Sequence, residues 1–214
     1  MIVAIDGPAG AGKTTVARAV AEKLGFAHLD TGALYRVVTL IALERGLSLE
    51  AGDEIATLVG AAPITVDGVN VAVGDRDVTS AIRSAEVTAA VSQVAAHPAV
   101  RRALVPHQRA AAGRDVVIEG RDIGTQVFPE ADVKIFLTAN PRARAIRRAR
   151  ELGVEKAVDQ LEGEIAARDR ADSTRSTSPL ERAADAVELD TSDMSFDAVV
   201  EAVVRAVDNA RSHR

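Results

Sequence analysis

The sequence predicts an α/β fold with a five-stranded parallel sheet flanked by helices. Short apolar segments alternate with longer segments whose apolar residues recur at helical spacing, which is typical of repeated β-α units. The chain has 214 residues, 47% of them hydrophobic, which is enough for one sizeable domain with its own core. We therefore expect a single α/β domain over residues 1–214.

Each expected strand is a short apolar run. The five runs are residues 2–5, 27–29, 116–119, 133–137 and 186–189.

Helices are expected between these strands. One starts near Thr31, because threonine is a good N-cap, and another at Asn140-Pro141, a capping residue followed by a proline. Pro106 is expected to kink or interrupt a helix over 100–112. A last helix follows Ser195 and places one apolar stripe in the core: Phe196, Val199, Val200, Val203 and Val207.

One segment departs from the β-α alternation. Residues 64–73 alternate apolar and polar side chains around Asp67-Gly68, a strong signal for an antiparallel β-hairpin. A hairpin there lies outside the parallel sheet. We therefore expect residues 31–96 to form an insertion between the second and third strands.

Composition excludes several classes of protein. The formal net charge is −5, with 26 Lys and Arg against 31 Asp and Glu, which argues against a nucleic-acid partner. The chain has no cysteine, which excludes disulfides and favours a reducing compartment. The first apolar run ends at Asp6, so we expect no signal peptide, no membrane partner and a cytoplasmic location.

Arginines are concentrated between Arg142 and Arg182. The planar guanidinium binds phosphate in a bidentate manner. An acidic chain with a local cluster of arginines therefore indicates a small anionic ligand.

Residues 7–14 match the phosphate-loop pattern G-x-x-x-x-G-K-[ST]. They lie between an expected strand and a helical pattern over 16–24, a context that disfavours an incidental glycine turn. Gly10 and Gly12 allow backbone N–H groups to approach phosphate, Lys13 reaches the β and γ phosphates, and the Thr14 hydroxyl can ligate Mg²⁺. The sequence therefore predicts a site for a nucleoside triphosphate with Mg²⁺.

Other segments indicate which kind of phosphate-loop protein this is. The chain lacks the Asn-Lys-x-Asp pattern with which GTPases recognise guanine. The run 116–119 ends in Glu119 and continues Gly120-Arg121-Asp122, whereas motor ATPases usually have adjacent acids there. An arginine directly after a strand indicates an anion in the crevice where α/β sheets bind ligands.

Four further segments resemble, in order, the signatures of bacterial cytidylate kinases: 30–36 (DTGALYR), 92–101 (SQVAAHPAVR), 119–125 (EGRDIGT) and 168–175 (RDRADSTR). The resemblance covers nearly the whole chain. It implies a P-loop kinase fold with a CMP-binding insertion at 31–96 and a helical lid at 142–175. It also implies a monomer that transfers the γ-phosphoryl of ATP to CMP or dCMP with Mg²⁺, in pyrimidine nucleotide metabolism.

The resemblance also implies roles for single residues. ATP would be bound by the loop and two lid arginines: Gly7, Pro8, Ala9, Gly10, Ala11, Gly12, Lys13, Thr14, Thr15, Arg144 and Arg148. The acceptor phosphate would be clamped by Arg36, Arg121 and Arg175, which with Lys13 form the catalytic set. The cytosine would be recognised by Ser92, Arg101 and Asp122, the sugar held by Arg168 and Asp172, and the pocket lined by Thr31 and Tyr35.

The chemistry of phosphoryl transfer is consistent with these roles. Three guanidiniums neutralise the acceptor dianion as it approaches a charged triphosphate, and its attacking oxygen is already anionic, so no general base is needed.

Each residue taken alone has a structural alternative. Arg36 could lie on a solvated helix face, Arg101 could pair with a neighbouring acid, and Asp122 and Asp172 could be turn or capping residues. Ser92 could be a surface hydroxyl. The lid arginines could belong to a charged, solvent-exposed helix.

Two other functions also stay open. One is a P-loop kinase for another small phosphate acceptor such as UMP, and the other is a non-catalytic nucleotide-binding regulator.

Three positions depart from the family pattern. Thr31 stands where serine is common, Glu119 where aspartate is common, and Ala171 where a lid-border arginine can occur. The first two keep a hydroxyl and a carboxylate. Ala171 leaves one positive charge fewer beside the transferred phosphoryl group.

Overall fold

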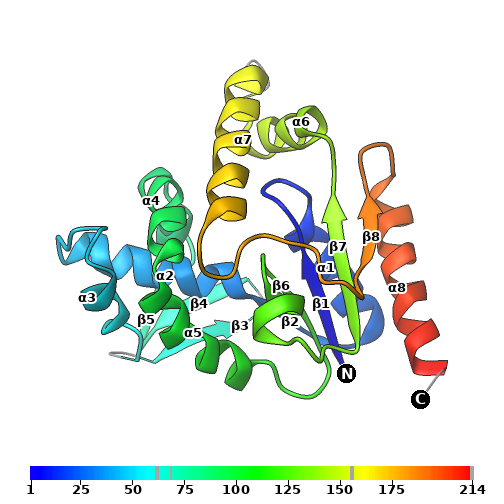
Figure 1. Ribbon diagram of the computed structural model, residues 1–214, viewed down its shortest axis with the longest axis horizontal. Helices are drawn as coiled ribbons and strands as arrows, with labels where there is room; N and C mark the ends of the chain where they lie inside the picture. Colours follow the sequence, from blue (N-terminus) through cyan, green and yellow to red (C-terminus); the bar gives the residue numbers. More distant parts are fainter. Residues whose placement is uncertain (61–62, 68, 155–156, 213–214) are drawn as a thin grey trace. The chain divides into compact units, whose positions relative to one another are not determined.

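The chain folds into two compact units, which are described separately (Figure 1). In the computed structural model the first unit comprises Met1–Ala27 with Arg114–Arg214, and the second His28–Gly113. The structure describes residues 1–60, 63–67, 69–154 and 157–212. Within these ranges, no helix combines the length and apolar character needed to cross a membrane.

The expected five-stranded sheet is confirmed, in the order β2-β6-β1-β7-β8. The central strand β1 (Ile2–Asp6) pairs in parallel with β6 (Val116–Glu119) and β7 (Val133–Thr138). Beyond β7 lies β8 (Val187–Asp190), also parallel, and β2 (Ala27–Asp30) is next to β6. The carboxyl end of β1 therefore lies between two parallel strands, and α/β sheets bind ligands at such a place.

Helices α1 (Lys13–Leu24) and α8 (Phe196–Ser212) contribute to one apolar core with β1, β6 and β7. Helix α8 follows Ser195, as expected, and the Ser195 hydroxyl caps it by accepting from the N–H of Ala198. The four valines of the predicted stripe are buried. Phe196 is 47% exposed, so its expected place in the core is wrong: as the first residue of α8 it lines a cavity instead.

Two helices follow β7 beyond its carboxyl end (Figure 1). Helix α6 (Pro141–Leu152) is capped by the Asn140 side chain, which accepts from the N–H of Ala143, as the sequence predicts. It packs against α7 (Val158–Thr174) through a small apolar cluster: Ala145, Ala149, Leu161 and Ile165.

The second unit starts with most of β2 and with α2 (Thr31–Glu44). The helix begins at Thr31, near the predicted start, but Thr31 is not its cap. The side chain of Asp30 accepts from the N–H of Ala33, and Asp30 has the extended backbone of an N-cap. Aspartate directly precedes threonine here, and it takes the capping position.

The predicted hairpin is present. Strands β3 (Ile64–Asp67) and β4 (Asn70–Val73) pair antiparallel, with Asp67 opposite Asn70. Gly68, part of the predicted Asp-Gly turn, lies outside the described residues. A short third strand, β5 (Arg76–Asp77), adds to β4 and was not predicted.

The remaining elements of this unit are helical: α3 (Gly52–Ala56), η1 (Ala81–Arg83), α4 (Ala85–Ala96) and α5 (Pro98–Ala111). Helix α5 continues through Pro106, so the predicted interruption is wrong. The carbonyl that loses its partner there belongs to Arg102, an exposed residue, so water can satisfy it. Val100 and Leu104 hold the same helix to the core.

Candidate active site

The phosphate loop joins β1 to α1 in the first unit. A Cβ on Gly7 would lie 2.1 Å from the carbonyl oxygen of Leu137 in β7, and Gly7 has a φ of +152°. Only glycine therefore lets the loop pass so close to β7. Helix α1 begins directly after Gly12, so its N–H groups and its positive end are available to an anion.

Lys13 is buried within this loop, with 7% of its surface exposed. Its Nζ donates to the carbonyl oxygen of Pro8 at 2.7 Å. Burial lowers the pKa of Lys13 well below its ordinary value, and the charges of Arg121 and Arg168 lower it further. An anion bound beside this lysine would favour its charged form.

Thr14 and Glu119 offer oxygen atoms that suit Mg²⁺. The Thr14 hydroxyl donates to Oε2 of Glu119, at the end of β6, at 2.8 Å. Among the described residues, no group of three acidic or histidine side chains could hold a metal ion by itself. Because Mg²⁺ commonly uses one or two protein oxygens together with substrate phosphates and water, these two residues fit the ion.

Asp6 links the start of the loop to the segment that carries Arg121 and Asp122. Its carboxylate accepts from the N–H groups of Ile123 and Gly124 at 2.9 and 2.8 Å. These amides belong to the π-helical turn η2 (Ile123–Val127), which the sequence did not predict. Burial raises the pKa of Asp6 to about 6. Sequence reasoning missed Asp6, although an acid at the end of a central strand was the available signal.

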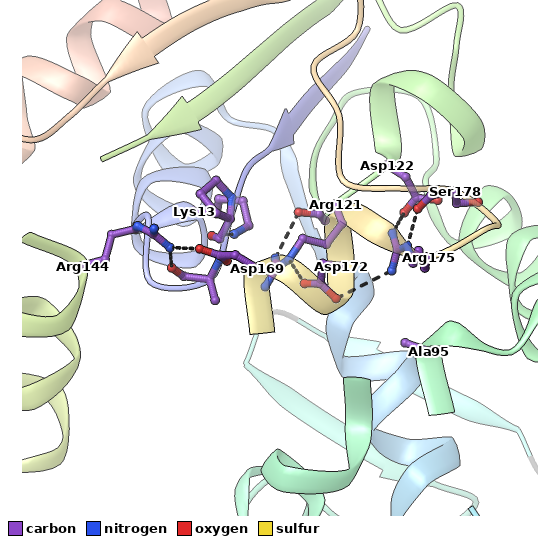
Figure 2. A network of polar contacts seen from close by, with 12 residues as sticks. Lys13, Ala95, Arg121, Asp122, Arg144, Asp169, Asp172, Arg175 and Ser178 are labelled. Carbon is purple, nitrogen blue, oxygen red and sulfur yellow. Dashed lines mark hydrogen bonds and ion pairs between the residues drawn. The ribbon is translucent and has the colours of Figure 1, made fainter. Parts of the chain in front are cut away.

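Four predicted acceptor residues form one network in the first unit (Figure 2). Arg121 Nε donates to Asp172 Oδ2 at 3.0 Å. The terminal nitrogens of Arg175 lie 3.9 Å from Oδ1 of Asp122 and from Oδ1 of Asp172, and its Nε donates to the carbonyl of Ser178. Both aspartates are at least 95% buried. The structure therefore brings these residues together as an alternating set of charges.

Arg168 belongs to the same helix as Asp172, α7. Its positive charge is one of the smaller causes of the lowered pKa of Lys13, after burial and Arg121.

The arginines of α6 reach different partners. Arg144 is 6% exposed and donates to the carbonyls of Ala139 and Ala9 and to Asp169. Arg147 donates to the hydroxyl and the carbonyl of Thr191. The partly exposed Arg148 pairs with Glu151 at 3.0 Å.

A cavity of about 240 Å³ lies beside the phosphate loop in the first unit. It is lined by the end of the loop, by α6 and by the start of α8: Ala11, Gly12, Thr15, Val16, Arg147, Glu151, Thr191, Met194, Phe196 and Val199. The mixture of apolar side chains with one arginine suits a flat, partly polar group. Of these residues, Ala11, Gly12 and Thr15 were predicted to bind ATP, and the other seven were not.

The second unit places the other predicted acceptor residues. Arg101 is 3% exposed; its guanidinium lies 5.2 Å from the centre of the Tyr35 ring and donates to the carbonyl of Ala95 at 3.0 Å. Arg36 donates to the Ile82 carbonyl at 3.0 Å and to the Thr88 hydroxyl at 2.9 Å.

Thr31 and Ser92 belong to the same unit. Thr31 is buried at the start of α2, and Ser92 lies partly exposed on α4. Within this unit, the structure brings Tyr35 and Arg101 together.

The fold and the loop define an α/β protein that carries a phosphate-binding loop and a second unit that begins within β2. A family model described as cytidylate kinase matches residues 3–209. The chain belongs to the cytidylate kinase family.

Individual relatives agree with this membership. The chain is 47% identical over 216 residues to a cytidylate kinase of Exiguobacterium sibiricum, covering 97% of both chains. It is 51% identical over 216 residues to a bifunctional pantoate ligase/cytidylate kinase of Synechococcus sp. (strain CC9902), covering 95% of this chain and 44% of that protein. The chain thus spans less than half the length of the bifunctional relatives it matches.

Among solved structures, an uncharacterized protein from Eubacterium ventriosum matches with a TM-score of 0.50 at 13% identity, covering 97% of this chain and 98% of that one. At this identity, the likeness concerns the fold alone.

Proposed function

We propose that this chain transfers the γ-phosphoryl group of ATP to CMP or dCMP, giving CDP or dCDP and ADP. The observation that carries the proposal is the arrangement of the first unit. A buried lysine lies in a phosphate loop, and burial together with the charge of Arg121 lowers its pKa. Arg121 in turn bonds Asp172, which also lies near Arg175. Membership of the cytidylate kinase family supports the choice of acceptor.

The donor is bound by the loop residues and by α6. The N–H groups at the start of α1 and the Lys13 ammonium receive the β and γ phosphates. The adenine fits the 240 Å³ cavity, where Arg147 is held by Thr191 and Phe196 is exposed. Binding energy from this pocket positions the γ-phosphoryl for transfer.

Mg²⁺ would be held by the Thr14 hydroxyl and the Glu119 carboxylate together with donor phosphates. When bound, the ion neutralises charge on the triphosphate.

The acceptor phosphate is clamped by Arg36, Arg121 and Arg175. In the structure Asp172 bonds Arg121 and lies near Arg175, which keeps both guanidiniums in place. These cations offset the repulsion between the two phosphates as they approach, and the transfer needs no general base because the attacking oxygen is an anion.

The nucleoside is recognised by the polar side chains that the resemblance assigns to it. Ser92, Arg101 and Asp122 offer the donors and acceptors that match the ring carbonyl, ring nitrogen and amine of cytosine. The Tyr35 ring beside Arg101 orients that guanidinium. Arg168 and Asp172 hold the sugar hydroxyls, and Thr31 lines the pocket. The lid over 142–175 closes over the donor and limits hydrolysis by water.

A coupled assay of ADP release with CMP, dCMP, UMP and AMP tests the proposal. We expect CMP or dCMP to give the highest kcat/KM. AMP or a non-nucleotide as the best acceptor would contradict the choice of acceptor. A preference for UMP would indicate a kinase for another pyrimidine nucleotide, and ATP binding without turnover would indicate a regulator. The monomeric state and the cytoplasmic location stay predictions from the sequence.

A further inference from the structure

Ala9, in the middle of the phosphate loop, has both of its backbone polar groups held by lid side chains (Figure 2). Its N–H donates to Asp169 Oδ1 at 3.0 Å, and its carbonyl accepts from a terminal nitrogen of Arg144 at 3.0 Å. Arg144 and Asp169 also form an ion pair with each other. One residue from α6 and one from α7 thus enclose a single peptide segment of the loop.

These three groups are shielded from water. The side chain of Arg144 is 7% exposed and that of Asp169 is 19% exposed. Arg144 Nε makes a further bond to the carbonyl of Ala139, at 2.9 Å. Charge-assisted hydrogen bonds in such surroundings are among the strong ones, and they fix geometry as well as contribute energy.

The loop also packs directly on the two helices. A Cβ on Gly10 would lie 3.3 Å from the Cβ of Arg144 and 3.5 Å from Cδ1 of Ile165. Gly10 has a φ of +73°, so its backbone needs glycine as well. The conformation of the loop at Ala9 and Gly10 therefore depends on where α6 and α7 lie.

A second ion pair between the same helices provides a contrast. Arg142 of α6 pairs with Asp159 and Glu162 of α7, and its partners include a carboxylate that is 90% exposed. This pair joins α6 to α7, and the bonds of Arg142 go to these carboxylates and not to the phosphate loop. The helices α6 and α7 are therefore joined to each other without the contacts that Arg144 and Asp169 make with Ala9.

We infer that Arg144 and Asp169 are positioning residues that hold the phosphate loop through Ala9 in the conformation that receives the donor. This inference rests on the proposed function for the identity of the donor, ATP. Asp169, to which the sequence assigned no role, thus helps to position the loop. Arg144 acts on the donor phosphates indirectly, through the backbone of the loop. Donor affinity then depends on the lid helices, because a loop held in advance loses less entropy on binding.

The test compares D169A, D169N and R144A with D159A as a matched control, by calorimetric titration with Mg-ATP and, separately, with CMP. D169A loses the hydrogen bond to the Ala9 N–H and the ion pair with Arg144. We expect it to bind ATP about tenfold more weakly, as for loss of a charged hydrogen bond. D169N keeps an oxygen for the Ala9 N–H, and its loss should be smaller. D159A should bind ATP within about twofold of wild type, because surface ion pairs contribute little.

Two further readouts separate positioning from general stability. The CMP affinity of D169N should stay within about twofold of wild type while its ATP affinity falls, because only the donor loop is disturbed. The double variant R144A/D169A should bind ATP no more weakly than the worse single variant, because both act through Ala9. If D169A does not fold, D169N carries the comparison.

The inference is overturned if D169N and D169A bind ATP as tightly as wild type, or if D159A weakens ATP binding as much as they do. It is also overturned if the ATP and CMP affinities fall together. Titration with ATP needs no acceptor, so a wild type that binds ATP without phosphorylating CMP refutes the proposed function and leaves this test intact. A wild type active on CMP with an insensitive D169N refutes only the positioning role.

Discussion

Asp6 gives a prediction that can be worked out quantitatively. Its carboxyl is 5% exposed, and burial raises its pKa from 3.8 to about 6. A pKa higher in the folded chain than in the unfolded chain means that the folded chain holds its proton more tightly. The stabilisation that Asp6 adds to the free energy of unfolding is therefore greatest below pH 3.8 and is lost as the pH rises through 6.

The size of the effect follows from the same two pKa values. The difference between the two pKa values means that burying Asp6 in its ionised form costs about 3 kcal/mol more folding free energy than burying it protonated. Between pH 7.5 and pH 5, proton linkage with these pKa values predicts that Asp6 adds about 1.4 kcal/mol to the free energy of unfolding.

The assay is urea unfolding of wild type and D6N at pH 7.5, 6.5 and 5. Other groups titrate equally in both chains, so the difference between their unfolding free energies isolates Asp6. The asparagine keeps one acceptor for the two N–H groups of Ile123 and Gly124 and does not titrate. As the pH falls from 7.5 to 5, we expect the unfolding free energy of wild type to rise by about 1.4 kcal/mol relative to that of D6N. A difference that is the same at all three pH values would refute the reasoning.

Three further predictions concern the proposed reaction. Lys13→Ala should abolish transfer to every acceptor, with at least about a thousandfold loss of kcat, because the donor loses its buried cation; activity near wild type would contradict this role. Asp122→Ala should reduce the preference for CMP over UMP by about tenfold, measured as a ratio of kcat/KM values; an unchanged ratio would remove Asp122 from base recognition. Gly7→Ala should weaken ATP binding at least about tenfold, because its Cβ would lie 2.1 Å from the Leu137 carbonyl and the loop must move; tight binding by this variant would show that the loop tolerates the displacement.

The sequence predicts the central fold well because its strands are short apolar runs bounded by polar residues. β1 and β6 are buried almost throughout, and such strands are visible as runs without any knowledge of their partners. The start of α2 was predicted near Thr31, where it lies, but its cap was not. Asp30 and Thr31 are both good capping residues, and only the backbone of Asp30 distinguishes them.

Other features depend on contacts between distant segments, which periodicity does not reveal. Phe196 fits the helical stripe of α8 but lies at its first position, where the core ends and the cavity begins. The two residues of β5 are too few to carry a pattern. For Arg144, the sequence indicates a helix face but not the carbonyl of Ala9 as its partner.

In the candidate site too, local motifs were predicted from the sequence and contacts between distant segments were not. The phosphate loop is a contiguous motif, so its residues were identified from sequence. Asp169 lies inside the signature segment 168–175, but the resemblance assigned it no role, and its contact is with an N–H group 160 residues away. Arg121, Asp172 and Arg175 lie in one network, and their roles toward the acceptor stay predictions.

The most direct test of the central claim follows the transferred group itself. The chain is incubated with Mg²⁺, CMP and ATP labelled on its γ-phosphate, and the products are separated by chromatography. The account predicts that the label appears in CDP in equal amount to the ADP formed, and that Lys13→Ala gives neither product. Label that appears as inorganic phosphate at the same rate with and without CMP would contradict it.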